Sequence, residues 1–203
     1  MAYAWTLFRS GQADSAVAQG RRALALEPLS PGLRHELVAL AIGARRYDLA
    51  LGEVQPGGGA AADPVSAVLE AYAQLLGGQA ARCADHDLGP WVALRAMCLQ
   101  QVGRAAEGAA LADSLARELD AEHYAFLHQY ADLAAYHAWR GNAAQTIHWF
   151  ERAVAHSPML HRWQLESGLF DKIRNQPAFR DGFARVRAEA EERLRVRRAA
   201  LGD

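Results

Sequence analysis

Apolar and small residues recur along this chain at the spacing of amphipathic helices, and glycine or proline interrupts them at regular places. Gly11 precedes Pro28 by 17 positions, and near the other end of the chain Gly141 precedes Pro158 by the same 17 positions. Alanines lie seven positions before each glycine and twelve positions after it. They are Ala4 and Ala23 in the first stretch and Ala134 and Ala153 in the second. The two stretches therefore share one template.

This template predicts a hairpin of two helices. The small residues let the helices approach closely, and the glycine permits the left-handed turn that ends the first helix. The proline ends the second helix and begins the next turn.

Three further hairpins are predicted between these two stretches, and the middle one is degenerate. Arg45 replaces the turn glycine in the second hairpin, Gly77-Gly78 breaks the third, and Gly103 keeps the turn of the fourth. The run QPGGGAAADP at 55–64 predicts a flexible loop. The predicted hairpins span 2–28, 31–55, 64–88, 90–120 and 124–157, and a C-terminal segment follows at 158–203.

The recurring template resembles the tetratricopeptide repeat, which has two helices per unit and a period of roughly 34 residues. The resemblance implies an all-α solenoid of about five antiparallel hairpins with a C-terminal capping helix. A general alanine-rich helical bundle is the alternative. Because Ala4 takes the eighth position of its repeat, the first helix has about half its usual length. We therefore expect the chain to be the C-terminal part of a longer protein.

The C-terminal segment contains Phe170-Asp171, Arg174, Pro177 and Phe179, at a spacing that resembles the tail of certain bacterial tetratricopeptide regions. Those regions are fused to winged-helix transcription regulators, adenylate cyclases or serine/threonine kinases. The resemblance implies the regulatory part of a larger bacterial signalling or transcription-regulatory protein.

An apolar stripe runs along the predicted last helix and should pack on the last hairpin. It consists of Phe179, Phe183, Val186 and Ala190. Beyond it, Glu and Arg predict a solvated helix with pairs such as Glu191–Arg195. The alternative is a basic patch that touches an acidic partner or phosphate, made of Arg193, Arg195, Arg197 and Arg198.

Composition favours an ordinary folded chain, with 51% hydrophobic residues, 22% charged residues and a net charge of −1. That charge gives no reason to expect nucleic acid or membrane as a partner of this region. No apolar run approaches a membrane span, and the N-terminus lacks a signal-peptide pattern. We therefore expect a soluble cytoplasmic chain, or a periplasmic one if a membrane helix lies upstream. The pairing of Cys83 and Cys98 stays open.

The tetratricopeptide resemblance places the first helix of each hairpin on the concave wall, which would bind a protein or peptide. The resulting groove residues are Trp5, Phe8, Arg9, His35, Ile42, Tyr72, Leu75, Met97, Gln100, Gln101, His128, Ala135 and Trp139. Their mostly apolar and aromatic character suits a hydrophobic segment or an amphipathic helix. Some of them could fill the core instead. Self-association is the alternative, with the tail helix or a missing N-terminal domain in the groove.

Catalytic and metal-binding patterns are weak. Cys83 and His86 have a helix-compatible metal-ligand spacing but no second pair, so a surface turn is the better interpretation. GxSxG, P-loop, GxGxxG and HExxH motifs do not occur in the sequence. We therefore predict no catalytic residue, cofactor or metal, and a non-catalytic interaction module. The alternative is a sensor that binds a small molecule or responds to pH through His35, His128 and His137, and an enzyme with an unfamiliar site is a third class.

Overall fold

The computed structural model of the chain is helical throughout the residues that it describes, which are 1–54, 64–121, 128–156 and 162–201. The α-helices are α1 (Ala2–Arg9), α2 (Ala13–Leu26), α3 (Pro31–Gly43), α4 (Tyr47–Glu53), α5 (Pro64–Leu76), α6 (Ala80–Ala84), α7 (Val92–Gln101), α8 (Ala105–Asp120), α9 (His128–Trp139), α10 (Ala143–His156), α11 (Arg162–Glu166) and α12 (Pro177–Leu201). A short 3-10 helix, η1 (Gly168–Phe170), lies between α11 and α12. Across these residues, no helix is both long and apolar enough to cross a membrane.

The turns inside successive helix pairs share one backbone conformation. Each contains a residue with positive φ: Gly11 (83°), Arg45 (59°), Gly78 (79°), Gly103 (85°) and Gly141 (82°). The N–H of the following residue then donates to the carbonyl five positions back, as from Gln12 to Leu7 at 2.9 Å and from Asn142 to His137 at 2.9 Å. This bond is the one that ends helices in the Schellman motif. The predicted turn glycines are therefore confirmed, and Arg45 adopts the same left-handed conformation, at a cost of about 1 kcal/mol.

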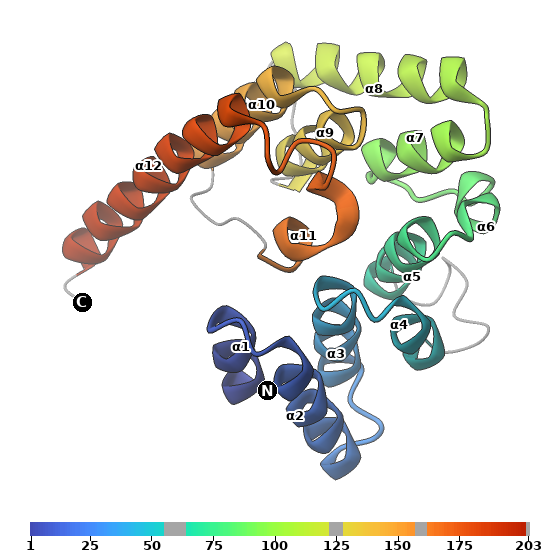
Figure 1. The fold of residues 1–203 in the computed structure, drawn as a ribbon, viewed down its shortest axis with the longest axis vertical. Coiled ribbons are helices and arrows are strands. Elements are labelled where there is room, and N and C mark those ends of the chain that lie inside the picture. Colours follow the sequence, from blue (N-terminus) through green and yellow to red (C-terminus); the bar gives the residue numbers. More distant parts are fainter. Residues whose placement is uncertain (55–63, 122–127, 157–161, 202–203) are drawn as a thin grey trace.

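The helix pairs follow one another along an arc, and α11 lies on the inside of that arc (Figure 1). The first helices α3, α5, α7 and α9 pack against one another in this order, and α11 packs against α3. Gly43 on α3 makes room for this arrangement. A Cβ at Gly43 would lie 2.5 Å from Phe8 Cζ and 3.1 Å from Trp163 Cα. Helices α1 and α11 therefore both approach the backbone of α3 more closely than a side chain would allow.

Two clusters of buried side chains form the core. The smaller one joins α1, α2 and α3, and the larger one extends from α3 to α12. Trp5, Leu49 and Trp163 are partly buried and pack against both clusters. The clusters are thus connected through side chains from the first helix, the second hairpin and the C-terminal segment.

The apolar stripe of α12 packs on the last hairpin, as the sequence predicts. Phe179, Val186 and Ala190 are buried, Phe183 is half-buried, and α12 contacts α10. The rings of Phe179 and Phe183 stack with centroids 5.4 Å apart.

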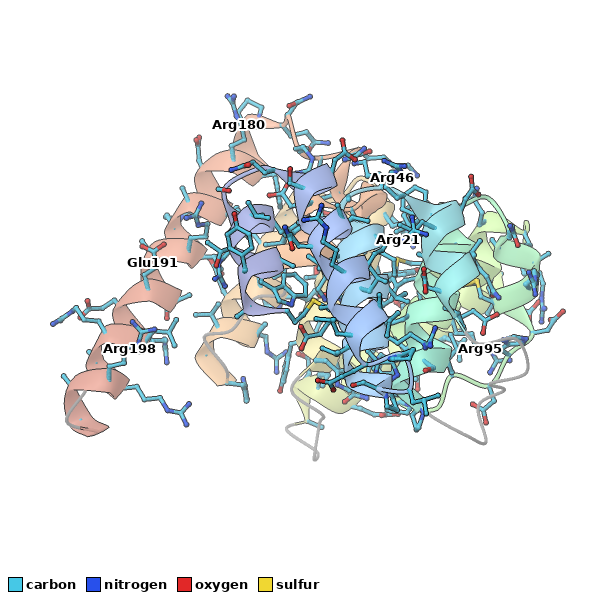
Figure 2. The ribbon with its side chains drawn as sticks, turned by 90° about the horizontal axis from the view of Figure 1, so that it is seen from below. Arg21, Arg46, Arg95, Arg180, Glu191 and Arg198 are labelled. Atoms are coloured by element: carbon cyan, nitrogen blue, oxygen red, sulfur yellow. A yellow bond between two sulfur atoms is a disulfide. The ribbon has the colours of Figure 1, made fainter. Side chains whose placement is uncertain are left out.

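The distal part of α12 carries Glu191 and Arg198 away from the body of the protein (Figure 2). Exposed ion pairs line this part, as expected, but Glu191 and Arg195 do not pair with each other. Arg187 bonds Glu191 at 3.4 Å, and Arg195 bonds Glu192 at 2.6 Å. Such pairs favour the interpretation of a solvated helix over that of a basic patch.

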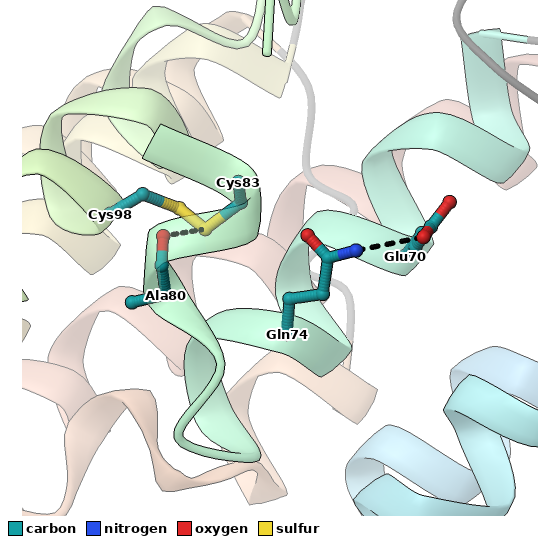
Figure 3. The surroundings of a disulfide bond; sticks show 5 residues. All are labelled: Glu70, Gln74, Ala80, Cys83 and Cys98. Carbon is teal, nitrogen blue, oxygen red and sulfur yellow. Dashed lines mark hydrogen bonds between the residues drawn. A yellow bond between two sulfur atoms is a disulfide. The ribbon is translucent and has the colours of Figure 1, made fainter. Parts of the chain in front are cut away.

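A disulfide joins Cys83 of α6 to Cys98 of α7 (Figure 3). Both residues are fully buried, and Cys83 lies in the short second helix of the degenerate hairpin. This bond attaches a helix of five residues, which has little stability of its own, to the next hairpin.

Reduction of this disulfide should lower the free energy of unfolding by about 3 kcal/mol, because the bond closes a loop with a sequence separation of 15. Urea unfolding with and without dithiothreitol measures the difference. A Cys83→Ala/Cys98→Ala variant is the control, since the reductant should leave its midpoint unchanged. Equal midpoints of the wild-type protein under both conditions would contradict the prediction.

Candidate functional site: a pocket on the inner side of the arc

A cavity of about 560 Å³ opens on the inner side of the arc. Its lining comes from α1, α3, α5 and α9, from Trp91 at the start of α7, and from α11. The lining residues are Trp5, Arg9, His35, Glu36, Ala39, Val65, Val68, Leu69, Tyr72, Trp91, His128, Asp132, Trp163 and Gln164. The volume falls within the range of roughly 300–1,000 Å³ that is typical of ligand pockets.

A buried polar network joins three helices in the wall of this pocket. The Tyr72 hydroxyl on α5 donates to Asp132 Oδ1 on α9 at 2.8 Å. Gln164 Nε2 on α11 donates to the Tyr72 oxygen and to Asp132 Oδ1, both at 3.1 Å. Burial, together with the neighbouring Asp132 carboxylate, raises the pKa of Tyr72 well above its usual value. The hydroxyl therefore stays protonated and remains a donor.

Two further contacts order the side of the pocket formed by α1, α3 and α5. Trp5 Nε1 donates a hydrogen bond to Glu36 Oε2 at 2.9 Å. The His35 Nε2 atom lies 2.8 Å from Ser66 Oγ. These contacts connect the first three hairpins across the pocket, because Trp5, His35 and Ser66 come from α1, α3 and α5 respectively.

Trp91 and His128 form another part of the pocket lining. Their rings stack with centroids 4.9 Å apart. Burial lowers the pKa of His128, so its imidazole is neutral at pH 7. These two rings therefore contribute aromatic and uncharged surface to the lining.

The C-terminal segment that completes the pocket is held by an arginine from the second hairpin. The Arg45 guanidinium donates to both carboxylate oxygens of Asp171, at 2.7 and 2.6 Å, and its Nε donates to the Glu166 carbonyl at 3.3 Å. Burial pushes the pKa of Asp171 upward, but the hydrogen bonds and charges of Arg45 and Arg174 together outweigh this effect, and the pKa falls below its usual value. Arg174 donates to the carbonyl of Leu165 at 2.7 Å.

These contacts give a structural reason for the tail motif that the sequence contains. Asp171 and Arg174 fix the bend after α11, and Pro177 begins α12. Phe170 and Phe179 are buried, with ring centroids 6.1 Å apart. The motif therefore shapes the segment that returns to the inner side of the arc.

Five of the predicted groove residues line the pocket: Trp5, Arg9, His35, Tyr72 and His128. They come from α1, α3, α5 and α9. Helix α7 contributes none of them, because only Trp91, at its N-terminal end, reaches the cavity.

The other predicted groove residues do not reach the pocket. Phe8, Ile42, Leu75, Met97 and Ala135 are buried in the core, with at most 4% of their surface exposed. Each lies on the first helix of its hairpin, as predicted, but its face is covered by a neighbouring helix. These five assignments to a partner-binding surface are therefore wrong.

Gln100, Gln101 and Trp139 also lie outside the pocket. Gln100 Nε2 donates to the Tyr136 hydroxyl at 2.9 Å, so it binds the neighbouring first helix. Gln101 is exposed at the end of α7. The Lys172 ammonium lies 5.1 Å from the centre of the Trp139 ring, so the C-terminal segment covers this ring.

The sequence interpretation missed several residues of the pocket. Asp132 interrupts the run of apolar and small residues from Tyr130 to Tyr136, and that interruption was a usable signal. Glu36 directly follows Arg34 and His35, so it did not stand out. Trp163 and Gln164 carried no such signal. They follow the last hairpin, and the sequence there has no repeat pattern that would indicate where the segment packs.

Metal binding finds no support among the described residues, where no group of three or more His, Cys, Asp or Glu side chains could hold an ion. The Cys83–His86 candidate is wrong, because Cys83 forms the disulfide and has no free thiolate to offer.

Comparisons with protein-family models, with curated proteins and with solved structures give no match for this chain.

Proposed function

We propose that this chain is a non-catalytic binding module of the tetratricopeptide type, in which a curved stack of five hairpins holds a segment of a partner protein. The shared turn geometry and the ordered packing of α3, α5, α7 and α9 support a solenoid. The resemblance of the tail supports a parent protein of the bacterial regulatory kind.

The observation that carries this proposal is the composition of the pocket wall. Successive hairpins contribute their first helices to one cavity, and the half-buried rings of Trp5, Trp91 and Trp163 line it. Aromatic anchors of this kind dominate the energy of peptide binding. Because neighbouring helices already hold these rings, little side-chain entropy is lost when a segment binds.

The disulfide bears on the compartment of the module. Disulfides persist mainly in oxidising compartments. The Cys83–Cys98 bond therefore supports the periplasmic alternative over a cytoplasmic location.

Peptides selected from a random linear library on the wild-type protein should bind at the pocket. Val65→Arg should weaken them by at least about tenfold, because Val65 is 46% exposed and lines the cavity, where a new arginine would block an anchor. Isothermal titration calorimetry measures the affinities.

Val196→Arg is the matched control for this measurement, because Val196 is 54% exposed on the distal part of α12, outside the pocket. Its affinity should equal that of the wild-type protein. Peptides that tolerate Val65→Arg as well as Val196→Arg would overturn the proposed function.

A second candidate function is a sensor module that binds a small molecule or responds to pH. It is favoured by the size of the cavity and by the presence of both His35 and His128 in its wall. The third histidine of that hypothesis, His137, does not line the cavity, and burial lowers its pKa to about 4, with a further contribution from Arg140.

Acidification should destabilise the protein through His137. Its pKa is about 4 in the folded state against about 6.5 in the unfolded chain, so only the unfolded chain binds the proton between these values. The contribution of neutral His137 to the free energy of unfolding is therefore fully present above about pH 6.5 and is lost as the pH drops toward 4. His128 acts in the same direction, because its pKa is also lowered.

Urea midpoints measured from about pH 7 to about pH 4.5 test this expectation. The His137→Gln variant should show a shallower loss than the wild-type protein. His86→Gln is the control, because His86 is exposed in a turn, and it should follow the wild-type curve. Parallel curves for His137→Gln and wild type would contradict the assignment.

A further inference from the structure

The second hairpin differs from the other hairpins at its turn. Arg45 adopts a left-handed φ of 59° there, whereas glycines take the equivalent place in the other turns. Across the described residues, Arg45 is the one non-glycine residue with a positive φ. Glycine takes this conformation without steric cost because it lacks a Cβ, and arginine does not. An arginine kept at such a place points to a role for its side chain.

The Arg45 side chain reaches the C-terminal end of α11. Its guanidinium donates to both carboxylate oxygens of Asp171, and its Nε donates to the Glu166 carbonyl at 3.3 Å. Glu166 is the last residue of α11, and arginine is a favourable donor to the carbonyls at a helix end. One side chain therefore joins the turn of the second hairpin to the segment that follows the last hairpin.

This attachment matters because α11 is short. The helix has five residues, too few to be stable on its own. Gln164 anchors its middle through Tyr72 and Asp132, and Arg45 anchors its end. Two attachments fix the rotation of a short helix, which one attachment does not. Trp163, half-buried in the pocket lining, is next to Gln164, so the place of its ring depends on both attachments.

We propose that Arg45 is a positioning residue of the pocket, which holds the end of α11 so that Trp163 stays in the wall. The role rests on the proposed function, since a partner segment would contact that ring. The side chains of Arg45 and Asp171 are 46% and 45% exposed, so their ion pair adds little to global stability. Its effect is local. The affinity of the pocket falls with the fraction of molecules in which the wall is complete.

Arg45→Gly is the informative variant, because it gives this turn the residue of the other turns and removes the contact with Asp171. In protein labelled with fluorotryptophan, fluorine NMR resolves the individual tryptophans, and Trp163→Phe identifies the resonance of Trp163. Arg45→Gly should shift or broaden that resonance and leave the resonance of Trp149, buried on α10, unchanged. The urea midpoint should stay equal or rise, because the left-handed strain is relieved.

Binding is measured by calorimetry with a peptide selected on the wild-type protein. Arg45→Gly should bind it at least about threefold more weakly, which corresponds to a complete wall in about a third of the molecules. Asp171→Asn removes the charge at the other end of the same contact, and it should change the resonance and the affinity in the same direction.

Arg46→Gly is the matched control. Arg46 is the next residue along the chain, and it pairs with the exposed Asp14 on α2 at 2.8 Å. This variant therefore loses an exposed ion pair of the same kind that does not involve α11. The Trp163 resonance and the peptide affinity should both equal those of the wild-type protein.

An unchanged Trp163 resonance in Arg45→Gly, or an unchanged peptide affinity, would overturn this inference. A urea midpoint that falls together with the affinity would also overturn it, because Arg45 would then act only through the stability of the fold. The proposed function fails by a separate result, namely selected peptides that tolerate Val65→Arg. In that case the Trp163 resonance alone decides whether Arg45 positions the segment.

Discussion

A buried hydrogen-bond network joins α5, α9 and α11, and it determines where the C-terminal segment lies on the inner side of the arc. The network consists of Tyr72, Asp132 and Gln164, each at least nine-tenths buried. Buried polar groups destabilise the fold unless they form hydrogen bonds, so the bonds within this network are required. Gln164 can take part only if the C-terminal segment returns from the last hairpin to the middle of the arc (Figure 1). The network therefore fixes the position of that segment relative to the third and fifth hairpins.

Because the C-terminal segment folds back onto the inner side of the arc, the surface there becomes a pocket of limited size. Arg45 holds Asp171 with two hydrogen bonds, and Gly43 lets the backbone at Trp163 approach α3. Trp163 then packs against both core clusters. In the proposed solenoid, the C-terminal segment would form the base of the groove. A bound segment would then contact a pocket lined by aromatic rings and carboxylates, and not a long channel.

The turns between paired helices could be predicted from the sequence because their signals are local. Positive φ at the turn requires glycine or a tolerated substitute, and this requirement made Gly11, Gly103 and Gly141 visible and even identified Arg45 as their equivalent. The pocket was harder to predict, because a first helix presents several faces. Periodicity alone did not separate Tyr72, which borders the cavity, from Leu75, which does not, because both side chains are buried on the same helix. Trp163 and Gln164 could not be predicted, since long-range contacts and not a repeat determine their position.

The central claim is that the C-terminal segment is an integral wall of the pocket, bound through Gln164. A double-mutant cycle with Tyr72→Phe and Gln164→Leu tests it most directly, because the free energies of unfolding of the two single variants and the double variant isolate the contact between the helices. We predict a coupling energy of about 1 kcal/mol, the usual net value of a buried hydrogen bond. Effects that add to within about 0.3 kcal/mol would contradict the account, because they would mean that α11 does not bind the third hairpin in solution.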